Sequence, residues 1–180
     1  MSEIVTLEPP QDRAVTLEEA RQQLRLDAHD EDLLLGAKLD AAQAELEQQT
    51  GLKLCEQTLE LQLEGWKDEI TVPVRPCTVA EIRYMAASGA MVTLPETVYV
   101  TRRRHRFTRI RPAFGKSWPE LRADSLIRIT LSAGFSENDP DLAIARAAIL
   151  VKTAAMFENR EGGPCLAFDT LVGQLKCRWI

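Results

Sequence analysis

The chain has 180 residues, of which 45% are hydrophobic and 27% charged. This is the composition of a globular protein, and it excludes a disordered tail, a collagen-like repeat and a small disulfide scaffold. The net charge of −5 argues against a protein that binds nucleic acid over its whole surface. The first residues lack a secretory signal, and no apolar stretch reaches the roughly 20 residues of a membrane span. We therefore expect a soluble protein that folds in a cytoplasm.

Charge is distributed unevenly along the chain. Residues 1–70 carry 17 acidic and 6 basic side chains, residues 71–130 carry 4 and 11, and residues 131–180 carry 6 and 5. The sequence therefore combines an acidic first third with a basic middle. Such asymmetry is typical of a protein that presents two different surfaces to its partners.

The first expected elements are two helices within residues 15–51. The sequence Thr16-Leu17-Glu18-Glu19 is a capping box, which predicts a short helix that ends near Arg25. Asp30 is the expected N-cap of a longer helix that ends at Gly51. An apolar stripe at helical spacing supports this second helix and consists of Leu35, Leu39, Ala42 and Leu46.

From residue 52 the apolar pattern alternates with the period of a β-strand. Strands are expected at Leu59–Leu63, Ile70–Val74, Val79–Met85, Ala90–Leu94, Val98–Arg102, Phe107–Arg111 and Ser125–Ala133. Pro73 cannot donate to a ladder, so its strand should lie at a sheet edge or end there. Short turns such as Ser88-Gly89 favour antiparallel pairing. The expected fold class is α+β, with helices at both ends packed around an antiparallel β-sheet or small β-sandwich insertion at residues 52–135.

A second long helix is expected from Asp139, its N-cap, to about Arg160, and a last short helix over Phe168–Lys176. The long helix is apolar over most of its circumference, so it needs burial on two sides. It is either a central helix wrapped by its own domain or a helix that also packs against a neighbouring subunit. We favour the second interpretation, because one small sheet offers few elements to surround it. The candidate subunit interface consists of Ala148, Val151 and Ala155.

No motif for catalysis is found. The sequence contains no glycine-rich phosphate loop, no nucleophile elbow and no zinc-binding helix, and it has only two histidines. Its four cysteines lack the spacing of metal or redox motifs and are expected to be reduced and structural. We therefore predict no catalytic residue, no cofactor and no metal; an enzyme of unrecognised type is the third hypothesis.

The strongest local charge signal is an arginine cluster in the middle of the chain, without an acidic residue between Glu96 and Glu120. Its candidate docking residues are Arg102, Arg103, Arg104, Arg106, Arg109 and Arg111. Aromatic residues interleave with it, as in many nucleic-acid-binding surfaces, namely Tyr99, Phe107, Phe114 and Trp118. Three interpretations remain open. The cluster is a solvated hairpin tip, a nucleic-acid-binding module formed by the 102–116 arginines, or a docking site for an acidic protein surface.

Three segments of the chain resemble, in order and spacing, the tailed-phage head–tail connector proteins, which also occur in phage-like gene transfer particles. The first contains Val15–Ala20, Leu24–Asp27, Asp30–Asp32 and Gln49–Leu52, the second is Pro112–Pro119, and the third is Pro140–Glu161. The resemblance spans residues 15–161 and leaves Leu171–Ile180 unmatched.

The resemblance implies a structural protein of the head–tail junction, made in the bacterial cytoplasm and incorporated into a virion or phage-like particle. It implies one connector domain over residues 1–180, with N-terminal helices at 15–51, the β insertion at 52–135, the long helix at 139–161 and a C-terminal segment at 162–180. Such proteins form a ring, usually dodecameric, beneath the portal protein, and the ring extends the DNA channel towards the tail.

The implied partners are other copies of the chain, the portal protein, a tail-side stopper or completion protein, and double-stranded DNA that passes without sequence-specific binding. An acidic wall would let DNA slide, whereas a basic wall would retain it. The first long helix therefore supplies the candidate channel-wall residues Glu31, Asp32, Asp40 and Glu47.

Overall fold

The computed structural model describes residues 2–26, 29–104, 107–159 and 163–176. The chain divides into two compact units. We call them the β unit, made of residues 1–10 and 56–134, and the helical unit, made of residues 11–55 and 135–180. Each unit has its own hydrophobic core. The expectation of one connector domain over the whole chain stays a prediction.

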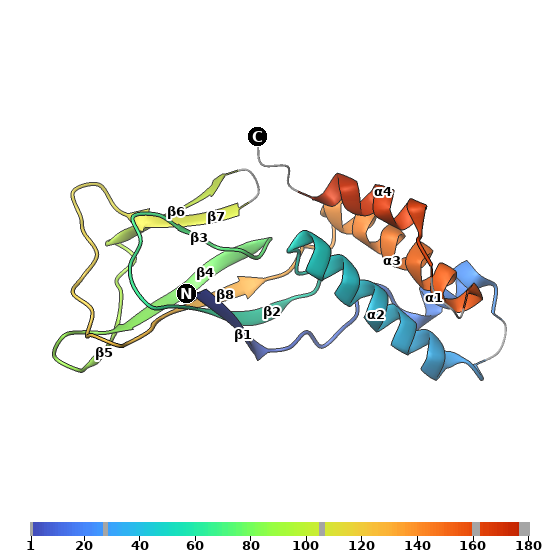
Figure 1. The fold of residues 1–180 in the computed structure, drawn as a ribbon, viewed down its shortest axis with the longest axis horizontal. Helices are drawn as coiled ribbons and strands as arrows, with labels where there is room; N and C mark the ends of the chain where they lie inside the picture. The colour runs from blue at the N-terminus through green and yellow to red at the C-terminus, as the bar shows by residue number, and fades with distance from the viewer. Residues whose placement is uncertain (1, 27–28, 105–106, 160–162, 177–180) are drawn as a thin grey trace. The chain divides into compact units, whose positions relative to one another are not determined.

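The described elements comprise helices and antiparallel strands, so the α+β class is confirmed (Figure 1). The helices are α1 (Leu17–Leu24), α2 (Asp32–Thr50), α3 (Pro140–Glu158) and α4 (Leu166–Leu175). The strands are β1 (Ser2–Glu8), β2 (Gln57–Leu63), β3 (Ile70–Thr71), β4 (Cys77–Met85), β5 (Met91–Thr93), β6 (Tyr99–Arg104), β7 (Phe107–Pro112) and β8 (Ile127–Ala133).

The β unit contains two antiparallel sheets, whose strand orders are β1-β2-β8-β4-β5 and β3-β7-β6. Strand β8 lies in the middle of the larger sheet, and its Ile129 pairs with Leu61 of β2 on one side and Ile82 of β4 on the other. These three side chains share a single core with Ile70 and Ile110 of the smaller sheet. The core therefore lies between two sheets, because alternate residues of each strand point to the same face.

The helical unit confirms most of the expected helix boundaries. Thr16 caps α1 in a complete capping box with Glu19, and Gly51 closes α2 with a left-handed φ of 69°. Asp139 caps α3 by accepting a hydrogen bond from the Asp141 amide. The expected cap at Asp30 is wrong, because α2 begins at Asp32 after Glu31 and no side chain caps it.

Helix α3 packs against α1, α2 and α4. Its most deeply buried apolar side chains, Ala145, Ala148 and Ile149, meet the α2 stripe and Phe168 of α4 in one core. The unusually apolar surface of α3 is thus used largely within its own unit. The helix ends at Glu158, and the end expected at about Arg160 lies outside the described residues.

The sequence analysis missed strand β1, which pairs antiparallel with β2. The strand is mostly exposed, so it lacks the alternation that marks a half-buried strand. The β-branched run Ile4-Val5-Thr6 was the available signal, because such residues favour extended backbone.

Candidate interaction surfaces

The arginine cluster lies on the hairpin formed by β6 and β7. In this hairpin Arg102 is opposite Arg109, and Arg103 is opposite Thr108. Arg102, Arg103 and Arg111 are exposed, whereas Arg109 is mostly buried and pairs with Glu69. The hairpin turn with Arg106, and the side chain of Arg104, lie outside the described residues. Of the cluster's described side chains, three arginines remain available to a partner.

Strand β6 is the outer strand of its sheet. The Ala113 amide donates to the Val98 carbonyl over 2.9 Å, and hydrogen-bonded pairs alternate along an antiparallel ladder. The main-chain groups of Thr101 and Arg103 therefore point away from β7. Consistently, the Thr108 carbonyl opposite Arg103 accepts from Val72 on the other side of β7 (2.9 Å). Strand β6 thus offers a free edge to which another strand can be added.

A cavity of about 340 Å³ adjoins this edge. Thr78, Thr101, Ser132, Arg102 and Arg103 are among its lining residues, and the lining contains no acidic residue. Hydroxyl and guanidinium groups donate hydrogen bonds, so the cavity suits a carboxylate or another anionic group.

Cys77 also lines the cavity, and its thiol lies among main-chain and hydroxyl oxygens. Its sulfur lies 3.3 Å from the Val74 carbonyl oxygen and 3.5 Å from the Thr108 hydroxyl. Burial raises the pKa of the Cys77 thiol, although the charge of Arg103 acts in the opposite direction. A protonated thiol is a poor nucleophile, so the cavity does not have the chemistry of a cysteine-dependent active site.

The aromatic residues near the arginines do not form a platform on which bases could stack. Tyr99 is buried, and Phe107 lies under the Arg75 guanidinium. Trp118 is stacked on Trp66 with a centroid separation of 4.5 Å. Only Phe114 of the four aromatic side chains is fully exposed. This arrangement removes the main observation that favoured a nucleic-acid-binding module.

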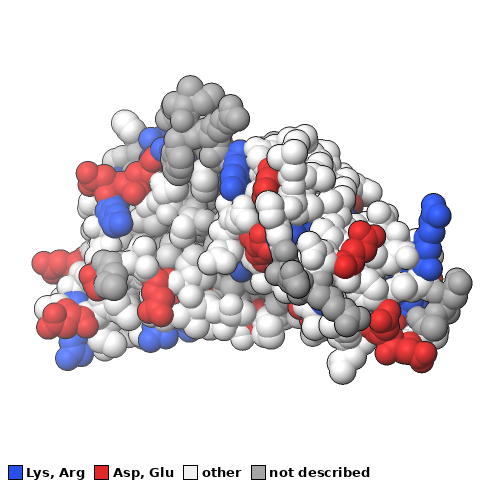
Figure 2. Space-filling view, turned by 45° about the vertical axis from the view of Figure 1, so that its right-hand side comes forward, with Lys and Arg blue, Asp and Glu red and all other residues white. Residues whose placement is uncertain are grey.

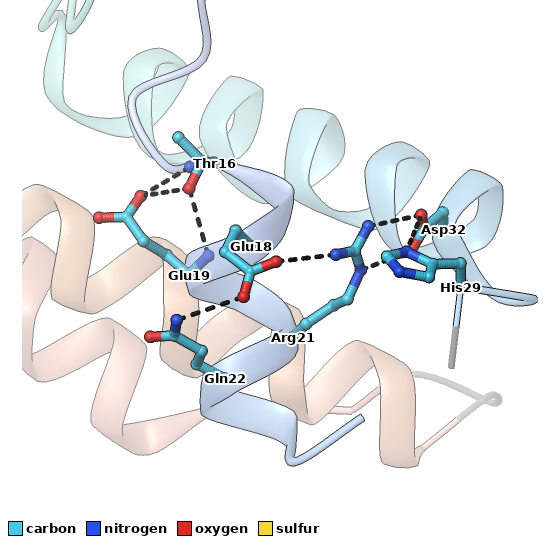
Figure 3. Close-up of polar contacts among 7 residues, drawn as sticks. All are labelled: Thr16, Glu18, Glu19, Arg21, Gln22, His29 and Asp32. Carbon is cyan, nitrogen blue, oxygen red and sulfur yellow. Dashed lines mark hydrogen bonds and ion pairs between the residues drawn. The ribbon is translucent and has the colours of Figure 1, made fainter. Parts of the chain in front are cut away.

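The candidate channel-wall carboxylate Asp32 lies in an ion-pair cluster that links α1 to α2 (Figure 3). Arg21 donates to Asp32 over 2.7 and 2.6 Å and to Glu18 over 2.8 Å. His29 lies 3.3 Å from the same Asp32 carboxylate. Hydrogen bonding by Arg21 lowers the pKa of Asp32. Asp32 is therefore engaged in holding the two helices together.

Two other candidate channel-wall carboxylates also have partners within the helical unit. Asp40 accepts two hydrogen bonds from Arg13, over 2.6 and 2.8 Å, and this contact lowers the Asp40 pKa. Glu47 is largely buried and pairs with Lys53 over 3.0 Å. Glu31 is exposed and has no ion pair within the described part of the chain. Figure 2 accordingly shows acidic and basic side chains interspersed on the face that it draws.

The three candidate interface residues of α3 have different environments. Ala148 is fully buried in the core of its own unit and has no surface to offer a neighbour. Val151 and Ala155 are half-buried. The face of α3 turned away from the core continues from Val151 through small apolar side chains, of which Ala143 and Ala147 are exposed. The structure thus shifts the candidate interface from Ala148 to this outward stripe.

Metal sites, membrane-spanning helices and disulfides are considered in turn. No cluster of three or more potential metal ligands occurs among them. Within the same residues, no helix is long and apolar enough to cross a membrane. Among the described residues, Cys55, Cys77 and Cys165 form no disulfide, and Cys177 lies outside the described part.

Sequence reasoning missed two features of these surfaces. The cavity beside β6 combines residues from distant segments, around Thr78, Thr101 and Ser132, and no local motif brings them together. The full exposure of Phe114 was also missed, although the neighbouring Gly115 is a turn signal that was available in the sequence.

Comparison with known proteins identifies the group to which the chain is similar. Residues 14–83 match the sequence model of the family described as "Phage gp6-like head-tail connector protein". No curated protein sequence matches significantly. The resemblance to head–tail connectors indicated by the sequence is therefore confirmed.

Solved structures share the fold over nearly the whole chain. One is described as the neck of an empty gene transfer agent particle computed with C6 symmetry (24% identity, TM-score 0.82, covering 99% of this chain and 97% of the other). A second comes from the virion of a native gene transfer agent particle (24% identity, TM-score 0.82, covering 98% of this chain and 96% of the other). A third is described as the neck of a native gene transfer agent particle computed with C12 symmetry (25% identity, TM-score 0.76, covering 100% of this chain and 97% of the other).

Proposed function

We propose that the chain is a structural head–tail connector subunit of a phage-like particle, and not an enzyme. Copies form a ring beneath the portal protein, and the ring joins the capsid to the tail-side stopper or completion protein. The observation that carries this proposal is the similarity along the whole chain to chains in the necks of gene transfer agent particles, whose structures were computed with C6 and C12 symmetry. The match of residues 14–83 to the connector family supports it independently.

The ring requires a contact between neighbouring copies, and the outward stripe of α3 is suited to this role. Ala143 and Ala147 are exposed, and Val151 is half-buried. Small side chains allow another helix or sheet to approach closely, and burial of their apolar surface favours association. We assign this stripe to the subunit interface of a dodecameric ring.

The lumen of the ring passes double-stranded DNA. The carboxylates of Asp32 and Asp40 are paired with arginines, so they add little net charge to any surface that faces DNA. Paired charges neither repel phosphate strongly nor retain it through counterion release. A wall of this kind lets DNA slide without sequence-specific binding.

The hairpin arginines dock on a protein partner in this proposal. Arg102 and Arg103 stand at the free edge of β6 and line a cavity without acidic residues. A guanidinium binds a carboxylate through two parallel hydrogen bonds, so an acidic segment of the portal or stopper protein fits this surface.

Cryo-electron microscopy of particle necks tests the proposal. Particles are prepared from cells whose only copy of the gene encodes either the natural chain or Ala147→Glu. A charge on the outward α3 stripe should prevent ring closure, because it would be buried without a partner at each contact. We expect heads without tails from Ala147→Glu and a closed ring of the natural chain in each complete neck.

Ala44→Glu provides a matched control, because Ala44 is an exposed alanine on α2 outside the stripe. It should assemble as the natural chain does. Complete necks that lack the chain would exclude the connector function. Normal rings from Ala147→Glu would instead reject the proposed interface and leave the function in place.

A further inference from the structure

Phe114 is a fully exposed aromatic side chain, with a relative exposure of 106%. It lies at the tip of a tight turn in the β unit, in which the Lys116 amide donates to the Ala113 carbonyl over 2.9 Å. Gly115 has a φ of +71°, as the third position of a type II turn requires. A side chain at Gly115 would meet no atom within 4 Å, so glycine is needed here for its conformation.

Contacts on both sides hold this turn in place. Before it, the Ala113 amide donates to the Val98 carbonyl over 2.9 Å. After it, Trp118 is stacked on Trp66 at 4.5 Å, and its indole N–H donates to the Lys67 carbonyl over 2.7 Å. Phe114 is thus presented on a preorganised support, which lowers the entropy lost when such a side chain binds.

The helical unit contains a hollow with complementary properties. Its volume is about 240 Å³, and its lining is Glu31, Leu34, Lys38 and Phe157. Leu34 is 44% exposed, and the adjacent Leu33 is 90% exposed. An apolar cavity of about 150 Å³ is large enough to hold benzene. A phenyl ring therefore fits the hollow, where it would contact Leu34 and Phe157.

A positive charge near Phe114 is complementary to a negative charge at the hollow. Lys116 is exposed two residues after Phe114, within a segment that has no acidic residue between Glu96 and Glu120. The lining of the hollow carries one acidic and one basic side chain, Glu31 and Lys38, and Glu31 has no ion pair among the described residues. An ion pair between Lys116 and Glu31 would fix the orientation of the inserted ring.

We propose that Phe114 of each subunit inserts into the Leu34–Phe157 hollow of the next copy of the chain. This inference rests on the proposed ring. Cyclic symmetry with head-to-tail contacts requires two different, complementary patches on every subunit. Phe114 supplies the projecting patch and the hollow supplies the receiving patch. Buried aromatic anchors of this type carry much of the affinity of protein interfaces.

Photocrosslinking in assembled particles tests the contact directly. Phe114 is replaced by p-benzoyl-phenylalanine, which keeps an aromatic ring at the position and reacts with nearby C–H groups on illumination. We expect a ladder of crosslinked copies, with mass spectrometry locating the acceptor within residues 31–38 or at Phe157. The same amino acid at Met91, a 51% exposed side chain of the β unit, is the control and should give no such ladder.

A double-mutant cycle on subunit association measures whether the two patches act together. Phe114→Ala and Leu34→Ala should each weaken association about 30-fold, as expected for a hot spot, and the double variant should be little weaker than either. Leu166→Ala removes another leucine of the helical unit that is 80% exposed and should have little effect. Gly115→Ala should weaken association without altering Phe114 itself, because it strains the turn.

The outcomes separate this contact from the ring itself. Crosslinks from Phe114 to another segment, to the portal or to a tail protein, in particles that contain the ring, would overturn the contact and leave the connector function intact. Independent, additive effects of Phe114→Ala and Leu34→Ala would overturn it equally. Complete necks without the chain would exclude the connector function.

Discussion

The helical unit contains 16 acidic and 10 basic side chains, and the β unit contains 11 and 12. In the helical unit the charges join separate segments, through Arg13–Asp40 at 2.6 Å, Arg146–Glu19 at 2.8 Å and Lys152–Glu45 at 2.9 Å. In the β unit, Arg102, Arg103 and Arg111 are exposed and have no ion-pair partner among the described residues. The helical unit, which has more charged side chains, thus pairs more of them with each other.

This difference shows that the formal charge of a segment does not predict the charge of its surface. The acidic first third of the sequence predicts an acidic surface, yet Asp32, Asp40 and Glu47 contact basic side chains of the same unit. In the basic middle of the chain, Arg102, Arg103 and Arg111 stay exposed without an ion pair among the described residues, whereas Arg109 pairs with Glu69. Association is therefore governed by the charges that remain after internal pairing.

The largest effect on stability is expected from a charge placed in the helical core. Ala148 is fully buried, whereas the adjacent Ala147 is exposed. Ala148→Glu should reduce the free energy of unfolding by about 4 kcal/mol or more, because a carboxyl group would be buried without a partner. Ala147→Glu should change it by less than about 0.5 kcal/mol. Urea unfolding followed by circular dichroism distinguishes the two; equal stability would place Ala148 at the surface.

A smaller effect is expected from truncating a core side chain in either unit. Ile129→Ala in the β unit and Leu46→Ala in the helical unit should each cost about 2–5 kcal/mol, since both side chains are fully buried. Trp66 and Trp118 belong to the β unit, whereas Trp179 belongs to the helical unit. Tryptophan fluorescence of a Trp179→Phe background therefore reports unfolding of the β unit. Circular dichroism of the helices reports unfolding of the helical unit.

These two probes test whether the units unfold independently. If the units unfold independently, Ile129→Ala shifts the fluorescence transition and leaves the circular dichroism transition nearly in place. Leu46→Ala then shifts the circular dichroism transition and leaves the fluorescence transition nearly in place. Coincident shifts in both signals would show a single cooperative domain, as the sequence analysis expects. Either result therefore settles the domain organisation of the isolated chain.

The smallest effect is expected from the exposed ion pairs, and it depends on pH. Hydrogen bonding by Arg13 lowers the pKa of Asp40 in the folded chain. A carboxyl group of this kind stabilises the fold above its unfolded pKa of about 3.9 and loses this contribution as the pH falls through the lower folded value. Asp40 is largely exposed, so its pair should contribute at most about 1 kcal/mol.

Arg13→Gln tests this expectation. The natural chain should lose helical stability as the pH is lowered from about 5 towards 2, and the variant should show a shallower loss because the Asp40 pKa is no longer lowered. Asp40→Asn should have the same effect, which provides a second measurement of the pair. Identical pH profiles for the natural chain and both variants would show that the contact has no energetic role in solution.

Most of the fold could be predicted from the sequence, because its signals are local. The capping box at Thr16, the closing Gly51 and the Asp139 cap placed three helix ends correctly. Alternating apolar residues placed the buried strand β8. The exposed strand β1 was missed because periodicity arises only when one face is buried.

The candidate surfaces were harder to predict, because they depend on partners distant in sequence. Asp40 is paired with a residue 27 positions away. Ala148 and Ala147 are chemically identical, and only the packing of α3 against other helices distinguishes the buried one from the exposed one. The arginines could be located from sequence, since their charge was not offset by nearby acidic residues.

The position of β8 has a consequence for synthesis of the chain on the ribosome. Strands β2 and β4 are translated early, yet each pairs with β8, which is the last strand to be made. The larger sheet therefore stays divided until residue 133 has left the exit tunnel. The helical unit likewise needs α3, which follows β8. A chain that stops early can complete neither core, so it would keep apolar surface and unpaired strand edges exposed and would be prone to aggregate.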